Sequence, residues 1–359
     1  MKYIHTSTLL RRAVLTCTML FGVPVSADNV LPDGLYLFPD IQATHISRQL
    51  PAPGDEWRYN PALDIFYSLQ QERFLALIEY FINRDEKEFE RVQLGWQLSP
   101  TARLWLGRFH NPLGFWNNAY HHGVHFQPGI TRPAFAAFED DGGIMPMHST
   151  GLYSDSDHYF GGSHINLRIG IVTDAQYRNG KIEPAEISDF GDIGQRDNFS
   201  LRVSYYPDSA RAIQYSVFFG HSLIDGEPTG VMEIEQHQFG LSALWHMESL
   251  ELIANYFFLS NTLVDSNTGV ASDRFANVYL HANYDLSPRW RVYGRAEHTF
   301  NRNNDIYLNL FPVFSTHRRV AGVNYRLTAS QRLSIEYDRT HSISGSPRYI
   351  RLQWSAFFQ

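Results

Sequence analysis

Apolar and polar side chains alternate along most of the chain with a period of two residues. In the segment 163–172, isoleucine and leucine take every second position, and asparagine, arginine and glycine stand between them. Successive side chains of a β-strand point to opposite faces of a sheet, so such a segment has one apolar face and one polar or small face. The spacing i, i+3, i+4 of an amphipathic helix is hard to find in this chain. The pattern therefore predicts an all-β protein.

The alternating segments predict about sixteen strands, and three of them, at 40–48, 102–109 and 147–153, have the weakest pattern. The predicted strands lie near residues 40–48, 61–69, 73–83, 89–98, 102–109, 147–153, 163–172, 198–206, 211–220, 236–246, 250–260, 274–285, 289–299, 317–327, 331–340 and 347–358.

The connections between these segments alternate between short and long. The short ones fall at 99–101, 207–209, 247–249, 287–288 and 328–330, and the long ones at about 110–146, 174–197, 222–234, 261–273 and 300–316. Tight turns at one rim and long loops at the other are typical of a transmembrane, antiparallel, up-and-down β-barrel. A soluble sandwich shows no such alternation. A barrel of about 16 strands encloses an aqueous channel rather than a filled core.

The N-terminal segment has the layout of a cleavable secretory signal peptide. Lys2, Arg11 and Arg12 precede an apolar run at 13–23, and the segment closes on Val25-Ser26-Ala27. The apolar run has about a dozen residues, whereas a membrane-spanning helix needs roughly 20. We expect cleavage after Ala27, so that residues 1–27 are the signal peptide and residues 28–359 form the outer-membrane barrel.

Composition excludes several classes of function for the exported chain. Cys17 is the only cysteine and lies within the signal segment, which leaves no thiol for disulfide or zinc-thiolate chemistry, and Thr16 is a poor match for a lipoprotein signal. Loss of three basic residues with that segment leaves 27 basic and 37 acidic residues, a formal net charge of −10. So acidic a chain is a poor binder of nucleic-acid phosphates. No segment after residue 27 approaches 18 consecutive apolar residues, so the pattern excludes helical membrane spans.

Aromatic residues make up 14% of the chain and recur near the ends of the predicted strands. Amphipathic rings favour the membrane interface, so they are candidates for the two aromatic girdles of a barrel, although aromatic residues also favour strands in general. The candidates are Trp96, Trp105, Tyr205, Trp245, Tyr284, Trp290, Tyr325 and Trp354.

Two short segments resemble known outer-membrane proteins. The final strand, Tyr349 to Phe358, resembles the C-terminal signal that the barrel assembly machinery reads, although Gln359 follows the terminal aromatic residue. The stretch Gly107-Arg108-Phe109-His110-Asn111-Pro112-Leu113-Gly114 is similar to the G-[KR]-x-x-x-P-x-G motif of Gram-negative porins related to the phosphate-selective family. The resemblance implies a porin and a homotrimer.

The longest irregular segment, 110–146, is the third loop on the long-loop side. In trimeric porins the third such loop folds into the lumen and narrows it, so the resemblance implies a constriction loop here. Its glycine and proline residues allow bends, and its many aromatic residues favour packing over disorder. The candidate residues of the constriction are Arg108, His110, Trp116, His121, His122, His125, Arg132, Glu139, Asp140 and Asp141.

Strand parity places a set of charged side chains on the lumen wall, where charge tunes the ion preference of a pore. The alternative is that these residues pair with each other across the sheet and only solvate a wet lumen. The predicted pore-lining residues are Arg168, Arg202, Arg291, Arg295, Arg326, Arg332, Glu297 and Glu336, with Glu79, Glu251 and Asp338 among the further lumen acids.

Other chemistry has weaker support in the sequence. The chain has 16 histidines, and His121 and His125 have a metal-ligand spacing, but only on a helix, so we expect polar lining and no bound metal or cofactor. Asp155-Ser156-Asp157 lacks the closing glutamate of an EF-hand, which favours a turn. The sequence motifs of nucleophile elbows, Walker A loops and zinc proteases are absent.

These observations favour an outer-membrane porin of a Gram-negative bacterium, a passive aqueous channel for small hydrophilic solutes or ions and not an enzyme. The expected partners are outer-membrane lipid, the barrel assembly machinery and the transported solutes. Two alternatives stay open: a barrel enzyme of the lipase or protease type, and a closed barrel that serves adhesion or assembly.

Overall fold

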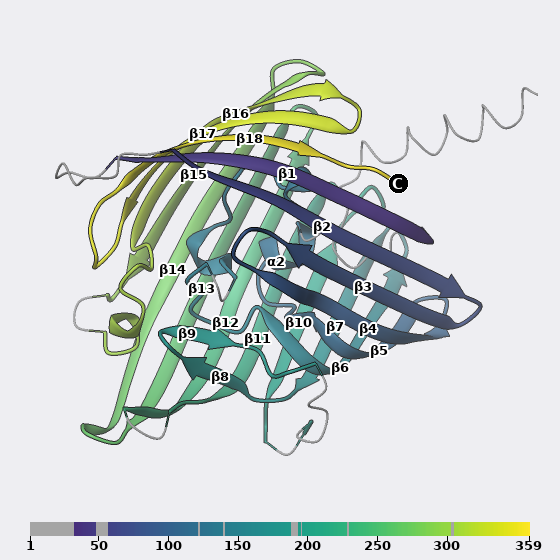
Figure 1. The fold of residues 1–359 in the computed structure, drawn as a ribbon. Coiled ribbons are helices and arrows are strands. Elements are labelled where there is room, and N and C mark those ends of the chain that lie inside the picture. Colours follow the sequence, from purple (N-terminus) through teal and green to yellow (C-terminus); the bar gives the residue numbers. More distant parts are fainter. Residues whose placement is uncertain are drawn as a thin grey trace, which may run out of the picture.

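The computed structural model describes residues 32–47, 57–120, 123–138, 141–187, 193–194, 196–227, 230–302 and 305–359. Within these ranges sixteen strands form the wall of one barrel (Figure 1). The wall strands are β1 (Gly34–Ser47), β2 (Trp57–Gln71), β3 (Phe74–Ile82), β4 (Lys87–Ser99), β5 (Ala102–His110), β6 (His148–Phe160), β7 (Ser163–Val172), β10 (Phe199–Tyr206), β11 (Ile213–Asp225), β12 (Val231–Met247), β13 (Leu250–Asp265), β14 (Gly269–Asp285), β15 (Trp290–Phe300), β16 (His317–Thr328), β17 (Gln331–His341) and β18 (Arg348–Ala356).

Each wall strand pairs antiparallel with the next one along the chain, and β1 pairs with β18, which closes the sheet. The closing register runs from Asp40 opposite Ser355 to Ser47 opposite Arg348. In the described ranges, closure pairs every wall strand on both of its edges, which is the condition for placing a sheet in a membrane. All sixteen predicted strands are confirmed, including the three with the weakest pattern.

The outer surface of the barrel is apolar and the inner surface carries the polar side chains. On β17, Leu333, Ile335 and Tyr337 are 42%, 52% and 45% exposed. Glu336 and Asp338, which alternate with them, are fully buried. The period-two pattern in the sequence therefore maps onto the outside and the inside of the wall, as in outer-membrane barrels. None of the helices in the described ranges has the length and hydropathy that a membrane-spanning helix needs.

Three expectations about the connections are wrong. The segments 222–234 and 261–273 are not long loops, because β11 to β14 continue past their apolar stripes and leave only 226–230 and 266–268 as turns. Backbone pairing continues there although both faces of the strands are more polar. The segment 174–197, by contrast, does form a long connection between β7 and β10, and it contains a hairpin, β8 (Ala175–Arg178) and β9 (Lys181–Glu183). The segment 155–157 lies within β6, and the turn is at 161–162.

The inner wall is not polar throughout, which the sequence pattern did not predict. Along β11 to β14 the inward side chains include Phe218, Ile253, Phe257 and Phe275, all nearly inaccessible to solvent. Trp105 also faces inward: it is 5% exposed, and its neighbours on β5, Leu104 and Leu106, face outward. Its assignment to an aromatic girdle is therefore wrong. The predicted signal peptide, residues 1–27, lies outside the described residues.

Candidate functional site: the lumen and its long loop

The loop between β5 and β6, residues 111–147, folds into the barrel. It contains α2 (Trp116–Ala119) and two 3₁₀ turns, η1 (Val124–Phe126) and η2 (Ala134–Ala136). Figure 1 shows α2 inside the ring of strands. It follows the β1–β2 and β3–β4 connections on the same rim of the barrel. The fold therefore places the longest connection of the chain across the lumen.

One face of this loop packs on the apolar half of the inner wall. Phe135 is fully buried and stacks on Phe257 of β13, with 4.0 Å between the ring centroids. Trp116 is also fully buried and lies 5.4 Å from the His281 ring of β14. Burial of a side chain of this size contributes about 1.5–3 kcal/mol. The loop thus fills the side of the lumen next to β11–β14.

Four of the arginines that we predicted on the lumen wall bind the loop. Arg295 donates to the carbonyl oxygens of Thr131 (2.8 Å) and Arg132 (2.9 Å). Arg332 donates to those of Val124 (2.8 Å) and Gln127 (2.7 Å). The carbonyl groups of Gln127, Thr131 and Arg132 lie outside helices and strands and need partners when they are buried.

The other two arginines of this set bind the first part of the loop. Arg168 donates to Asn118 Oδ1 (2.8 Å), and Arg202 donates to the Gly114 carbonyl. Arg168 and Arg202 belong to a small pocket behind the loop and do not line the open part of the lumen.

The predicted lumen acids also hold the loop. Glu336 accepts hydrogen bonds from the backbone N–H groups of Ile130 (3.0 Å) and Thr131 (3.2 Å) and from the Thr131 hydroxyl (2.6 Å). Glu297 accepts one from the Ala134 N–H (2.7 Å). Asp64 of β2, the third strand beyond β17 around the wall, accepts one from the Gly123 N–H (3.0 Å). Bonds to ionised groups are the stronger kind. Acidic side chains of β2, β15 and β17 thus fix the loop at three points.

An open space of about 490 Å³ remains between the loop and the wall formed by β1–β4 and β16–β18. About a third of its lining residues are charged, and acids outnumber arginines. The acids are Asp40, Asp64, Glu79, Glu86, Glu88, Glu90, Asp141 and Asp338, and the arginines are Arg132, Arg318 and Arg351.

Arg318 and Arg351 are functional candidates that the sequence reasoning missed. Both donate to Asp338 Oδ2, at 2.7 Å and 2.9 Å. Arg132 of the loop lies with its guanidinium 3.6 Å from the Phe138 ring centroid. Strand parity was a sufficient signal, because Arg318 and Arg351 alternate with outward residues on β16 and β18.

Comparison with solved structures returns outer-membrane channels of the same architecture. The outer membrane channel DcaP of Acinetobacter baumannii matches with a TM-score of 0.57 at 11% identity, over 90% of this chain and 96% of that chain. Salmonella typhi OmpF, solved with daunomycin, matches at 0.59 and 11%, over 91% and 98%. The anion-selective porin from Comamonas acidovorans matches at 0.57 and 12%, over 90% and 99%.

The chain has the fold of Gram-negative outer-membrane porins. The predicted resemblance to porins is thus confirmed at the level of the fold, while the resemblance to the phosphate-selective family stays a prediction. No protein-family model matches the sequence, and no curated protein matches it.

Two predicted pore-lining arginines lie away from both the loop main chain and the open space of this porin fold. Arg291 forms a two-bond ion pair with Asp285, at 2.6 and 2.8 Å. Arg326 is exposed near the short-turn end of β16.

The predicted constriction residues divide in the same way. His110 and Asp141 line the open space with Arg132, whereas Trp116 packs on the wall. Arg108 donates to the carbonyls of Phe89 (3.1 Å) and Ala185 (2.7 Å) and so braces the wall. Of the remaining five predicted residues, His121, His122, Glu139 and Asp140 lie outside the described residues, and the fifth is His125.

His125 sits beside β17 and β18, and its pKa is lowered from the ordinary value of 6.5. Burial and the guanidinium group of Arg332 are the main causes that lower the pKa of His125 to about 4, and Arg326 lowers it further. Its Nδ1 lies 3.2 Å from Ser355 Oγ. The imidazole is therefore neutral at pH 7, where an added charge between arginines would be unfavourable.

One group of side chains on the lumen wall has the composition of a metal site. Glu90, His110 and His148 come from three neighbouring strands, are all buried, and place one ligand atom each within 4.8 Å of the others. The sequence-based prediction of a candidate metal pair, His121 and His125, did not include them.

Proposed function

We propose that this chain is an outer-membrane porin that forms a passive aqueous channel for small hydrophilic solutes or ions. The observation that carries the proposal is the open, charge-lined space that remains beside the docked loop of a sixteen-stranded barrel. Water and polar walls along such a path replace about 30 Å of hydrocarbon, which lowers the free energy of a hydrated solute on its way across the membrane. Passage needs no covalent step, so the proposed function is not enzymatic.

We further propose that the channel prefers cations. Eight acids and three arginines line the open space. The acidic residues of this lining thus outnumber the arginines by five. Fixed negative charge along a pore raises the local concentration of cations. An acidic lining is a poor fit to phosphate, which the sequence motif suggested.

We also propose how this porin is exported and assembled. We expect export with cleavage after Ala27, insertion by the barrel assembly machinery through the final strand, and a homotrimer, on the resemblance to porins. N-terminal sequencing of the mature protein tests the cleavage site, and the mass of the detergent complex by light scattering tests the trimer.

Conductance in a planar bilayer tests the channel. The refolded mature protein should give discrete, ohmic current steps. A barrel that is correctly folded but silent contradicts the proposal, and hydrolysis of lipid or peptide by that silent protein would favour a barrel enzyme.

The sign of the reversal potential under a potassium chloride gradient tests the ion preference. We expect the sign of a cation-selective pore. An anion-selective sign would mean that Arg132, Arg318 and Arg351 dominate the field in the lumen.

A further inference from the structure

The two histidines of the Glu90–His110–His148 group stand at the base of the long loop. His110 is the last residue of β5, His148 is the first residue of β6, and the two are direct partners in the antiparallel register. Their rings meet edge to face, with 4.6 Å between the centroids. The 37 residues of the loop thus leave and re-enter the wall between these two imidazoles.

Glu90 reaches the histidines because β4 is irregular at this point. The register between β3 and β4 shifts between Glu79 and Tyr80, so that Glu79 is opposite Arg91 and Tyr80 is opposite Phe89, and Glu90 is the extra residue. Glu90 and Arg91 both lie buried on the lumen side, although consecutive strand residues normally face opposite ways. Bulges that re-aim a side chain are frequent next to functional sites.

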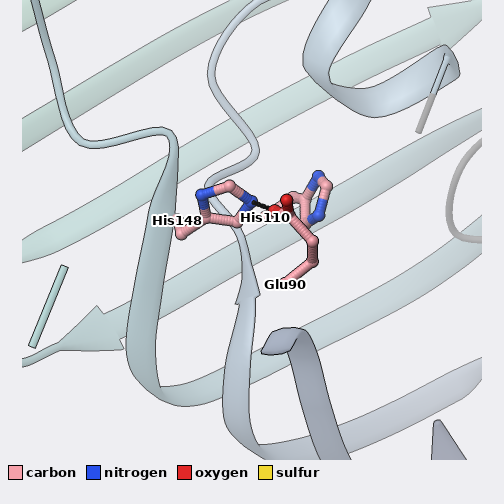
Figure 2. A group of neighbouring side chains, drawn as sticks. All are labelled: Glu90, His110 and His148. Atoms are coloured by element: carbon pink, nitrogen blue, oxygen red, sulfur yellow. Dashed lines mark ion pairs between the residues drawn. The ribbon is translucent and has the colours of Figure 1, made fainter. Parts of the chain in front are cut away.

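Figure 2 shows the three side chains converging, with the Glu90 carboxylate next to the His148 imidazole. His148 Nε2 and Glu90 Oε2 are 2.7 Å apart, and the ligand atoms of all three residues lie within 4.8 Å of one another. Two imidazoles and one carboxylate are a common ligand set for Zn²⁺ and similar divalent ions, with bonds of about 2.0–2.2 Å. Side-chain rotations that move the ligand atoms by about an ångström would place all three within bonding distance of one ion.

We propose that Glu90, His110 and His148 bind a divalent transition-metal ion of the Zn²⁺ type on the lumen wall. Glu90 and His110 line the open space, so an ion in the lumen has a path to the site, and water can complete its coordination. The surroundings suit a cation: Glu79 Oε2 lies 3.9 Å from His110 Nε2. The Phe138 ring of the loop covers the His148 ring at 4.8 Å and shields that side from solvent.

A bound ion at this point would join β4, β5 and β6 and tie the two ends of the long loop together. Metal ligands that are already held by hydrogen-bonded strands lose little conformational freedom on binding, which favours affinity. The site goes beyond the proposed channel function, because binding of an ion to the wall does not require conduction.

Zn²⁺ titration of the full mature barrel in detergent tests the site. The protein is made without a histidine tag, treated with a chelator and titrated in competition with a chromophoric chelator. We expect one tightly bound Zn²⁺ per chain, and Glu90→Gln and His148→Gln should each weaken the affinity at least about tenfold, as even outer-shell changes do at metal sites.

The chain offers a matched control in a second group, His221, Glu235 and His237, on β11 and β12. His237→Ala should leave the tight binding unchanged. Heat-dependent gel mobility shows whether each variant is folded. Glu90→Gln keeps the size of the side chain, so it remains informative if His148→Gln fails to fold. Absence of stoichiometric Zn²⁺ binding overturns the proposal, and so does an affinity that Glu90→Gln leaves unchanged in the folded barrel. Because the titration measures no current, its result is independent of whether the barrel conducts.

Discussion

The inward arginines and glutamates act mainly on the main chain of the long loop. Arg295, Arg332, Glu297 and Glu336 each bind backbone groups of residues 124–134. A charged side chain forms a stronger hydrogen bond with a backbone N–H or C=O group than a neutral side chain does. A buried backbone group without a hydrogen-bond partner costs about 1–3 kcal/mol of stability. The first role of these four charged side chains is therefore to hold the loop in position.

Glu336→Gln should loosen the loop. The amide has one acceptor oxygen and brings an NH₂ group toward the N–H groups of Ile130 and Thr131, which now donate to the carboxylate. Loss of about 1.5–3 kcal/mol should speed amide hydrogen exchange in the peptide around residue 130 about 10- to 100-fold. Hydrogen exchange followed by mass spectrometry measures this change. Glu233→Gln, at the rim, is the control and should leave that peptide unaffected; equal exchange in the two variants would contradict the anchoring role.

Arg332→Gln should raise the pKa of His125. The main cause of the low value, about 4, is burial, so the pKa should stay below its ordinary value of 6.5 when one of the two arginines is removed. Histidine NMR of labelled protein in detergent gives the titration. Arg319→Gln, exposed on the outer face of the same barrel, should not change it.

The same pKa has a consequence for the docked loop. His125 binds a proton less readily in the docked loop than in a free one, so docking loses stability as the pH falls from 6.5 toward about 4. Above pH 6.5 this contribution does not change with pH. Acidification that left the loop equally protected from exchange, after correction for the intrinsic pH dependence of exchange, would contradict this conclusion.

The loop is an element with two different faces. Its aromatic face packs on β11–β14, and its backbone is bound by charged groups from β2, β15 and β17. The backbone conformation explains the two outer glycines of the 107–114 motif, because Gly107 has φ +133° and Gly114 has φ +76°. A Cβ at Gly114 would also lie 2.6 Å from the Phe257 ring. The motif thus marks where the chain leaves the wall and turns onto the apolar surface.

Phe135→Ala should detach the aromatic face of the loop. Removing a fully buried phenylalanine costs about 3–5 kcal/mol, and the loss here falls on the contact with Phe257. We expect faster amide hydrogen exchange in the peptide around residue 135 and a larger single-channel conductance. The control is Phe160→Ala at the 161–162 turn, where the ring is 61% exposed, and it should change neither. An unchanged conductance would mean that the loop does not limit the current.

At the scale of the whole molecule, the loop divides the lumen into a filled half and an open half. The filled half lies against the apolar wall, and the open half lies against the acidic side chains of β1–β4 and the arginines of β16 and β18. Conduction and ion preference therefore belong to one side of the barrel.

Glu88→Gln, on the open side, should reduce the preference for cations. A unit charge about 4 Å from a passing ion in water contributes about 1 kcal/mol, so the permeability ratio should fall about two- to fivefold. The shift of the reversal potential measures it. Glu233→Gln lies outside the open space and should have no such effect. If both variants shift the potential alike, the surface charge of the barrel, and not its lumen, sets the preference.

The sequence was informative about the candidate site only in part. Parity identified inward charges correctly as a class, yet it gave no means to distinguish Arg295, which only holds the loop, from Arg318, which holds the loop and also lines the open space. The alternation of inward and outward positions could not identify Glu90, because a bulge places it on the lumen side together with its neighbour Arg91. The apolar inner wall of β11–β14 was also missed, since the pattern of its strands was read as polar on the inside.

The sequence by itself determined the sixteen strands, the rim to which each connection belongs and the outward face of each strand. It could do so because a period of two residues converts position in the chain directly into side of the sheet. The tertiary structure alone decided how the lumen is filled. The loop has no such period, and its anchors are distant in sequence: Gly123 and Asp64 are 59 residues apart, and Ile130 and Glu336 are 206 apart. Contacts over such distances depend on closure of the barrel, which brings β17 and β2 to the same enclosed space.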